Sequence, residues 1–137
     1  MLVFLLDTCA MIWIANGDRL REPAASELRK VPDPGARLVV SPMTAWEIAM
    51  LVAKGKMALA SSPDVWFERF CKLPGVTLAE MPPSMLVASA NLPGGPPNDP
   101  VDRILVATAR EFGYTLVTRD RHVLEYGRHG HVRVMGC

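Results

Sequence analysis

Four places in this chain put a carboxylate where it could do chemistry. Asp7 follows the apolar run Leu2–Leu6, and Asp120 follows Thr115–Thr118, so each is expected just past the end of a buried strand. In open α/β sheets, ligands bind beyond the carboxyl ends of the strands. Acids at such points also cap the next helix or turn, and for either residue alone the sequence leaves both interpretations open.

Glu47 is the only charged residue between Arg37 and Lys54. The surrounding stretch, residues 44–53, is apolar nearly all round, and a helix of that kind is expected to be mostly buried. A lone ionised carboxylate there is costly, so Glu47 should have a partner. That partner is either a metal ion or a distant Arg or Lys in a buried ion pair.

Asp99-Pro100-Val101-Asp102 has the pattern of a helix start, with Asp at the N-cap, Pro at the first position and an acid three residues on. Positions three apart share a helix face, so both carboxylates are able to point at one site. We expect Asp102 to be the inner residue and Asp99 to be a helix cap or a supporting residue.

The four acids Asp7, Glu47, Asp102 and Asp120 are predicted to converge at one edge of the sheet. Clustered carboxylates repel one another unless a cation lies between them. A site of hard oxygen ligands without His or Cys suits Mg²⁺ or Mn²⁺. Such an ion lowers the pKa of a bound water enough to make it a nucleophile, so the pattern indicates phosphodiester hydrolysis.

The elements that must position these acids are short strands alternating with helices, which predicts βαβ units and a mostly parallel sheet. The expected strands are Leu2–Leu6, 38–40, Val76–Leu78, Thr115–Thr118 and 132–135. The expected helices are Thr8–Ala15, 24–30, 42–54, 63–70, 82–90, Pro100–Phe112 and 121–126, with Ser41 as the N-cap before Pro42.

The length of 137 residues, half of them hydrophobic, fits a single domain spanning 1–137. A net charge of +1 excludes a strong global field for nucleic acid or membrane, though not a local basic patch. Three widely spaced cysteines suggest neither a disulfide framework nor a zinc knuckle. With no signal peptide and no span of roughly 20 apolar residues, a soluble cytoplasmic protein without a membrane partner is expected.

Four motifs in series resemble a PIN domain, and most closely the VapC-type toxins of type II toxin–antitoxin modules. They are LLDT at 5–8, SPMTAWEIA at 41–49 with KGKM at 54–57, NDPVDRILVA at 98–107, and LVTRD at 116–120. The resemblance covers nearly the whole chain. It implies a three-layer α/β/α fold with a central, mostly parallel sheet, and places the family's four acidic positions on Asp7, Glu47, Asp102 and Asp120, with Asp99 as the leading acid of the third motif.

The resemblance also implies an Mg²⁺- or Mn²⁺-dependent endoribonuclease acting on structured RNA such as tRNA or rRNA. It implies a homodimer and a small cognate antitoxin whose tail blocks the acidic site and whose N-terminal part binds operator DNA. One departure is Cys9, since many relatives carry His after Asp-Thr. A thiol cannot replace an imidazole as a base, and it cannot replace it as a positively charged partner for a phosphate.

Other residues near the motifs have two interpretations each. The hydroxyls of Thr8, Ser41 and Thr118 either orient metal-bound water or cap helices and satisfy backbone groups. Arg103 either reaches a phosphate or pairs with an acid. Arg119 and Arg121 belong to a basic C-terminal stretch that either contacts the RNA backbone or is a solvated face.

The aromatic side chains at helical spacings are expected in the core, a dimer seam or an antitoxin groove rather than as base-stacking platforms. They are Trp13, Trp46, Trp66, Phe67 and Phe70.

Two other function classes remain open. An aspartate-nucleophile phosphatase usually needs a second Asp two residues after the first, where this chain has Cys9, and a lysine near the phosphate, whereas no lysine follows Lys72. The third class is a non-catalytic interaction domain in which the acids serve as caps.

Overall fold

The structure, a computed structural model, describes residues 2–137 and has a five-stranded parallel sheet at its centre. The strand order is β3-β2-β1-β4-β5, so the first strand lies in the middle. The strands are β1 (Leu2–Leu6), β2 (Ala36–Val40), β3 (Val76–Leu78), β4 (Thr115–Thr118) and β5 (Val134–Gly136).

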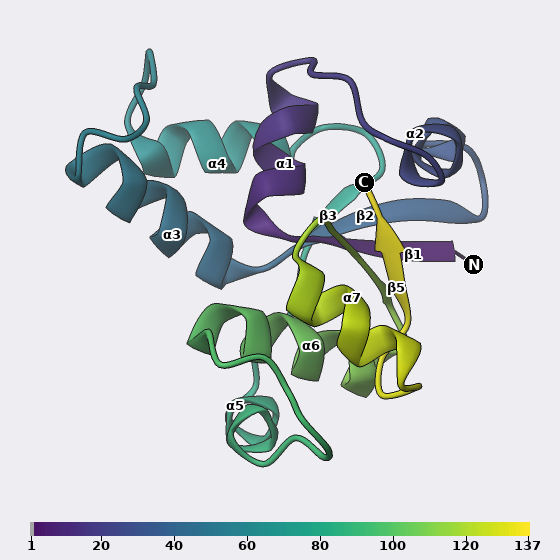
Figure 1. Cartoon of the computed structure of the whole chain (residues 1–137). Coiled ribbons are helices and arrows are strands. Elements are labelled where there is room, and N and C mark those ends of the chain that lie inside the picture. Colours follow the sequence, from purple (N-terminus) through teal and green to yellow (C-terminus); the bar gives the residue numbers. More distant parts are fainter. Residues whose placement is uncertain (1) are drawn as a thin grey trace.

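Helices cover both faces of this sheet, and Figure 1 shows α1 to α4 on one side and α5 to α7 on the other. The helices are α1 (Thr8–Ala15), α2 (Ala24–Glu27), α3 (Pro42–Ala53), α4 (Pro63–Cys71), α5 (Pro83–Ala90), α6 (Pro100–Phe112) and α7 (Arg121–Arg128). Among the residues that the structure describes, none of these helices has the length and apolar content to cross a membrane. The predicted three-layer α/β/α arrangement is confirmed.

Alternation along the strands divides the core into two hydrophobic clusters. Phe4 and Leu6 of β1 pack in the cluster beneath α1, α3 and α4, whereas Leu5 packs in the cluster beneath α6 and α7. Successive side chains of a strand point to opposite faces, so an unbroken apolar run serves both layers. This explains why Leu2–Leu6 has no polar residue before Asp7.

The acids gather because the sheet is parallel and its strand order reverses at β1. The chain adds β2 and β3 on one side of β1, then returns to add β4 and β5 on the other. Leu6 of β1 lies beside Val40 of β2 and Val117 of β4, so all three strands end at one edge. That edge is the topological switch point, where ligands bind in open α/β sheets.

Several expected elements differ from the observed ones, and β2 begins two residues earlier than expected, at Ala36. The predicted helix over 24–30 is a short α2 followed by a 3₁₀ turn, Leu28–Lys30. The last strand begins two residues later than expected, at Val134. The expectation that residues 44–53 are mostly buried is wrong, because only Thr44 and Ile48 of α3 are buried.

The reason for that exposure is visible in Figure 1, where α3 leads away from the sheet and lies beside α4. Only one side of α3 therefore meets the protein interior. Trp46 is 54% exposed. The apolar character of α3 thus indicates an uncovered surface rather than a buried helix.

Candidate active site

Asp7 is both a helix cap and a member of a polar cluster. Its Oδ1 accepts a hydrogen bond from the Ala10 backbone N–H at 2.7 Å, which caps α1. Its Oδ2 accepts one from the Thr118 hydroxyl at 2.6 Å. The capping interpretation is therefore correct, and it leaves the carboxylate fixed at the end of β1 rather than excluding it from a site.

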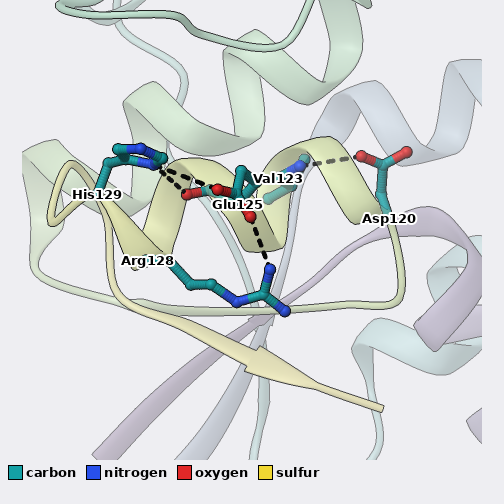
Figure 2. A network of polar contacts seen from close by, with 5 residues as sticks. All are labelled: Asp120, Val123, Glu125, Arg128 and His129. Atoms are coloured by element: carbon teal, nitrogen blue, oxygen red, sulfur yellow. Dashed lines mark hydrogen bonds and ion pairs between the residues drawn. The ribbon is translucent and has the colours of Figure 1, made fainter.

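Thr118 connects the acids that follow the two central strands. While its hydroxyl donates to Asp7, its Oγ1 accepts a hydrogen bond from the Asp120 backbone N–H at 3.0 Å. Asp120 in turn caps α7 by accepting from the Val123 N–H at 3.0 Å, as Figure 2 shows. The buried threonine thus satisfies the Asp120 backbone N–H, as one interpretation of its hydroxyl expected, and at the same time holds Asp7 in fixed relation to it.

Glu47 is brought to the same edge by a second threonine. The Thr8 hydroxyl donates to Glu47 Oε1 and lies 3.3 Å from the Thr44 hydroxyl. Within residues 2–137, no Arg or Lys forms an ion pair with Glu47. The alternative of a pair with a distant Arg is therefore excluded for the described chain.

Asp99 and Asp102 divide their roles along the start of α6. Asp99 Oδ1 accepts from the backbone N–H groups of Val101 and Asp102, at 2.9 and 3.0 Å, so it is the N-cap that the sequence indicated. In the part of the chain that is described, no group donates a hydrogen bond to the Asp102 carboxylate. It is the least committed carboxylate of the cluster.

All five acids line one cavity of about 590 Å³. Its remaining wall is partly apolar, from Trp13, Trp46, Met50 and Leu51, and partly basic, from Lys54, Lys56 and Arg119. The two lysines were not among the site residues predicted from the sequence. Their signal is the Lys-Gly-Lys stretch directly after α3, on the same side as Glu47.

The carboxylates raise one another's pKa values. Burial is the main cause of the raised pKa of Asp102, which is about 7, followed by the charges of Asp99, Asp120, Asp7 and Glu47. Burial also raises the pKa of Asp7 against the lowering effect of the Thr118 hydrogen bond. Burial likewise raises the pKa of Glu47, against the lowering effect of the hydrogen bond from Thr8. A raised carboxyl pKa means that the ionised form is disfavoured, which is the condition that a bound cation would relieve.

The donor set fits a hard divalent cation, since every candidate ligand is a carboxylate oxygen. Across the described residues, no three Asp, Glu, His or Cys side chains are gathered tightly enough to hold an ion as they stand. The predicted ligand set is brought to one cavity, and metal coordination by it stays a prediction.

The expected arginine contacts need one correction. Arg103 neither pairs with an acid nor turns to the acidic cavity, because Nε, Nη1 and Nη2 donate to the carbonyl oxygens of Ser89, Pro97 and Ala90. We assign it a structural role in place of an RNA contact.

Arg119 does line the cavity. It lies 3.8 Å above the Trp13 ring centroid and donates twice to the Cys137 carbonyl. Arg121 is exposed at the start of α7. Ser41 caps α3 through the Met43 N–H, as predicted.

Cys9 is exposed and lines the same cavity. Burial of the sulfur and the charge of Asp7 raise the pKa of its thiol, so the neutral form prevails near pH 7. A neutral thiol provides no positive charge for a phosphate and is a poor base. The structure therefore gives Cys9 none of the chemistry that an imidazole would supply at this position.

Thr118→Val removes the hydroxyl that joins Asp7 to Asp120. We expect the variant to lose about 1–3 kcal/mol of unfolding free energy, because a buried backbone N–H and a carboxylate each lose a partner. Affinity for Mg²⁺ should fall roughly 10- to 100-fold, as for other groups that orient metal ligands. Chemical denaturation and calorimetric titration measure the two effects.

Thr115→Val, in the same strand, is the matched control, because Thr115 has no side-chain hydrogen bond within residues 2–137. It should leave Mg²⁺ affinity unchanged. Equal Mg²⁺ affinity for wild type and Thr118→Val would contradict the role of Thr118.

Comparison with known proteins agrees with this geometry. The family model of the PIN domain matches residues 4–128, which include every acid described above. Ribonuclease VapC22 of Mycobacterium tuberculosis is 31% identical over 124 residues, which are 90% of this chain and 91% of that protein.

Solved structures with the same fold come from several bacteria. VapBC2 from Rickettsia felis, bound to a promoter DNA fragment, gives a TM-score of 0.68 at 12% identity and covers 98% of both chains. VapBC-1 from nontypeable Haemophilus influenzae gives 0.61 at 17% identity, covering 97% of this chain and 96% of that one. FitAcB from Neisseria gonorrhoeae gives 0.57 at 20% identity, with coverages of 96% and 95%.

Proposed function

Because this chain belongs to the PIN-domain family and within it to the VapC-type ribonucleases, we propose that it hydrolyses RNA phosphodiester bonds as a metal-dependent endoribonuclease. In this proposal it acts in the cytoplasm as the toxin of a type II toxin–antitoxin module. Family membership favours this function over an aspartate-nucleophile phosphatase, which the sequence alone had left open.

One observation carries the proposal. Carboxylates from four separate segments, which follow β1 and β4, lie on α3 and begin α6, line a single cavity at the switch point of the sheet. Asp7, Glu47, Asp99 and Asp120 each accept a hydrogen bond that holds the carboxylate in place, whereas Asp102 accepts none within residues 2–137. Folding alone gives no reason to collect five acids at one place, since burial and then mutual repulsion raise the pKa values of three of them.

In this function Asp7, Glu47, Asp102 and Asp120 would hold Mg²⁺ or Mn²⁺. When bound, an ion of this type activates water and neutralises charge on a phosphate. The chain's own residues provide the positioning: Thr118 fixes Asp7, Thr8 fixes Glu47, and Asp99 orders the first turn of α6 around Asp102. Lys54, Lys56 and Arg119 supply the positive charge along the cavity wall that RNA phosphates require.

The direct test uses an end-labelled structured RNA, a tRNA or an rRNA fragment, incubated with the purified protein. We expect internal cleavage with Mg²⁺ or Mn²⁺ and none in EDTA. Asp7→Asn should remove cleavage, and should relieve the growth arrest that follows production of the protein alone. Gel analysis of the fragments and growth curves measure these outcomes.

Asp18→Asn, at an exposed position after α1, is the matched control and should cleave and arrest growth like wild type. Equal toxicity of wild type and Asp7→Asn would rule out the catalytic explanation. Cleavage that persists in EDTA would rule out the metal.

The proposed partner is a small cognate antitoxin, and the proposed assembly includes a homodimer. The cavity that holds the acids is walled on α3 by the exposed Trp46 and the half-buried Met50. That surface suits an apolar peptide segment carrying a basic side chain, which would pair with the acids. The similar solved structures are of VapBC and FitAB proteins, one with promoter DNA, which supports operator binding through the partner.

A further inference from the structure

A second cavity, of about 550 Å³, opens onto the same acids from a different direction. It shares Asp99, Asp102 and Asp120 with the first cavity, but its other walls are the loop 94–98 and one face of α7. The first cavity is instead walled by α1 and α3, which lie on the opposite side of the sheet from α7 in Figure 1. The three shared acids therefore lie between two hollows.

The loop wall of the second cavity is held in place by three independent contacts. The Tyr126 hydroxyl donates to the Pro93 carbonyl, and Arg103 Nη1 donates to the Pro97 carbonyl at 3.2 Å. Gly94, with a positive φ of 68°, packs directly against the His131 ring. A Cβ at this position would lie only 2.6 Å from His131 Nε2. A cavity with a fixed wall is preformed for a ligand rather than created by it.

The helix wall presents ring-bearing residues at helical spacing. His122 and Tyr126 lie four positions apart on one face of α7, and His129, the C-cap residue directly after the helix, lines the same cavity. Tyr126 is buried and stacks on His131 with ring centroids 4.6 Å apart. His122 and His129 are exposed, so their imidazole faces are free to stack on a ligand.

His129 is oriented by Glu125, as Figure 2 shows. His129 Nδ1 lies 3.0 Å from the Glu125 carbonyl oxygen and 3.7 Å from Oε1. Because a carbonyl oxygen only accepts, Nδ1 is the donor, and in the neutral ring Nε2 is left as an acceptor. Arg128 holds the other carboxylate oxygen of Glu125 at 2.6 Å.

The lining of this cavity repels a phosphate and suits a planar group that donates hydrogen bonds. Among the described residues that line this cavity there is no Lys or Arg, and there are four carboxylates, Asp99, Asp102, Asp120 and Glu125. The first cavity is lined by five carboxylates, but three cationic side chains, Lys54, Lys56 and Arg119, stand beside them. Flat imidazole and proline surfaces beside hydrogen-bond acceptors are the groups that receive an unpaired nucleobase.

We propose that this second cavity receives the base of an unpaired nucleotide adjacent to the scissile phosphate, with His122 and His129 as its stacking and hydrogen-bonding groups. The proposal rests on the proposed ribonuclease function. The backbone phosphates then follow the basic wall of the first cavity, and the reacting phosphate lies between, over the shared acids. Arg103 acts here as a positioning residue that holds the loop wall.

The experiment pairs changes in the protein with changes in the RNA. Cut sites are mapped on a structured transcript with Mn²⁺. A short single-stranded RNA spanning one cut is then synthesised in its natural form and with an abasic ribose at each nucleotide flanking the cut. Steady-state kcat and KM are measured on each RNA for wild type, His122→Ala and His129→Ala. Both histidines are exposed, so melting temperatures should match wild type.

We expect His129→Ala to lower kcat/KM on the natural RNA roughly 5- to 150-fold, the range of one base–aromatic stack. The loss should be mainly in KM, because the contact binds ground and transition states alike. On one of the abasic RNAs, the same variant should differ from wild type by less than about twofold.

Glu111→Ala is the control, an exposed residue outside both cavities, and should behave like wild type on every RNA. If wild type cleaves and His129→Ala lowers kcat/KM equally on natural and abasic RNA, or on neither, the proposed base site is wrong. The ribonuclease function would still stand. Failure of wild type to cleave any RNA with Mn²⁺ would contradict the ribonuclease function, and the base site would fall with it.

Discussion

Asp102→Asn is expected to lower RNA cleavage roughly 100- to 1,000-fold while making the metal-free protein more stable at pH 8. A metal ion stabilises transition-state charge by several kcal/mol, and each 1.4 kcal/mol is tenfold in rate. The gain in stability follows from the raised pKa of Asp102, about 7, because above that pH the folded state carries an ionised carboxylate that is partly buried and that its acidic neighbours repel. Loss of activity with a gain in stability separates a functional acid from a structural one.

Cleavage rates and thermal melts of the metal-free protein measure the two effects together. Asp33→Asn is the matched control, since Asp33 is an exposed acid in the turn before β2 and should be neutral in both assays. A fall in melting temperature for Asp102→Asn would show that the carboxylate supports the fold. Wild-type cleavage rates in that variant would remove it from the catalytic set.

The second large effect is a coupling between pH and divalent metal. The pKa of Asp102 is raised from its ordinary value of 3.8 to about 7. The folded state therefore binds this proton more tightly than the unfolded state. The resulting contribution to stability is fully present below about pH 3.8 and is lost as the pH rises through about 7. The pKa values of Asp7 and Glu47 are raised as well, so both contributions have the same sign.

Mg²⁺ should reverse this trend, because it binds the ionised carboxylates. At 100 times its dissociation constant a ligand adds about 2.7 kcal/mol of stability, which for a chain of this size raises the melting temperature by roughly 8 °C or more. We expect that rise at pH 8 and a much smaller one at pH 5, as measured by thermal melts in EDTA and in Mg²⁺.

Asp102→Asn provides the internal control for this coupling. It should flatten the pH dependence of the metal-free melting temperature and remove most of the rise with Mg²⁺. A rise that is equal at pH 5 and pH 8 would show that the ion binds elsewhere. An unchanged melting curve at both pH values would support a non-catalytic domain.

The local chemistry of the acids could be predicted from the sequence. Asp7, Asp99 and Asp120 each precede a helix, and each caps it in the structure through a backbone N–H. Capping depends on neighbours within three residues, so it can be inferred from a short stretch. For Asp7 and Asp120 the sequence presented capping and catalysis as alternatives, whereas in the structure each of these carboxylates caps a helix while lining the cavity.

The environment of α3 could not be predicted in the same way. Its apolar composition is compatible with a buried helix or with an uncovered surface, because composition does not say how many sides a helix packs against. Trp46 is exposed because of where α3 lies relative to the sheet. The same applies to Glu47, whose partner is Thr8, a residue 39 positions away in the sequence.

The sequence by itself determined where the strands and helices lie and which acids are candidates for the site, because apolar runs, caps and prolines act over a few residues. Only the tertiary structure decided that Thr118 joins Asp7 to Asp120, that Arg103 holds a loop, and that a second cavity meets the acids. Those relations depend on strand order and on contacts between distant segments, and a parallel sheet with its reversal at β1 is what brings them to one edge.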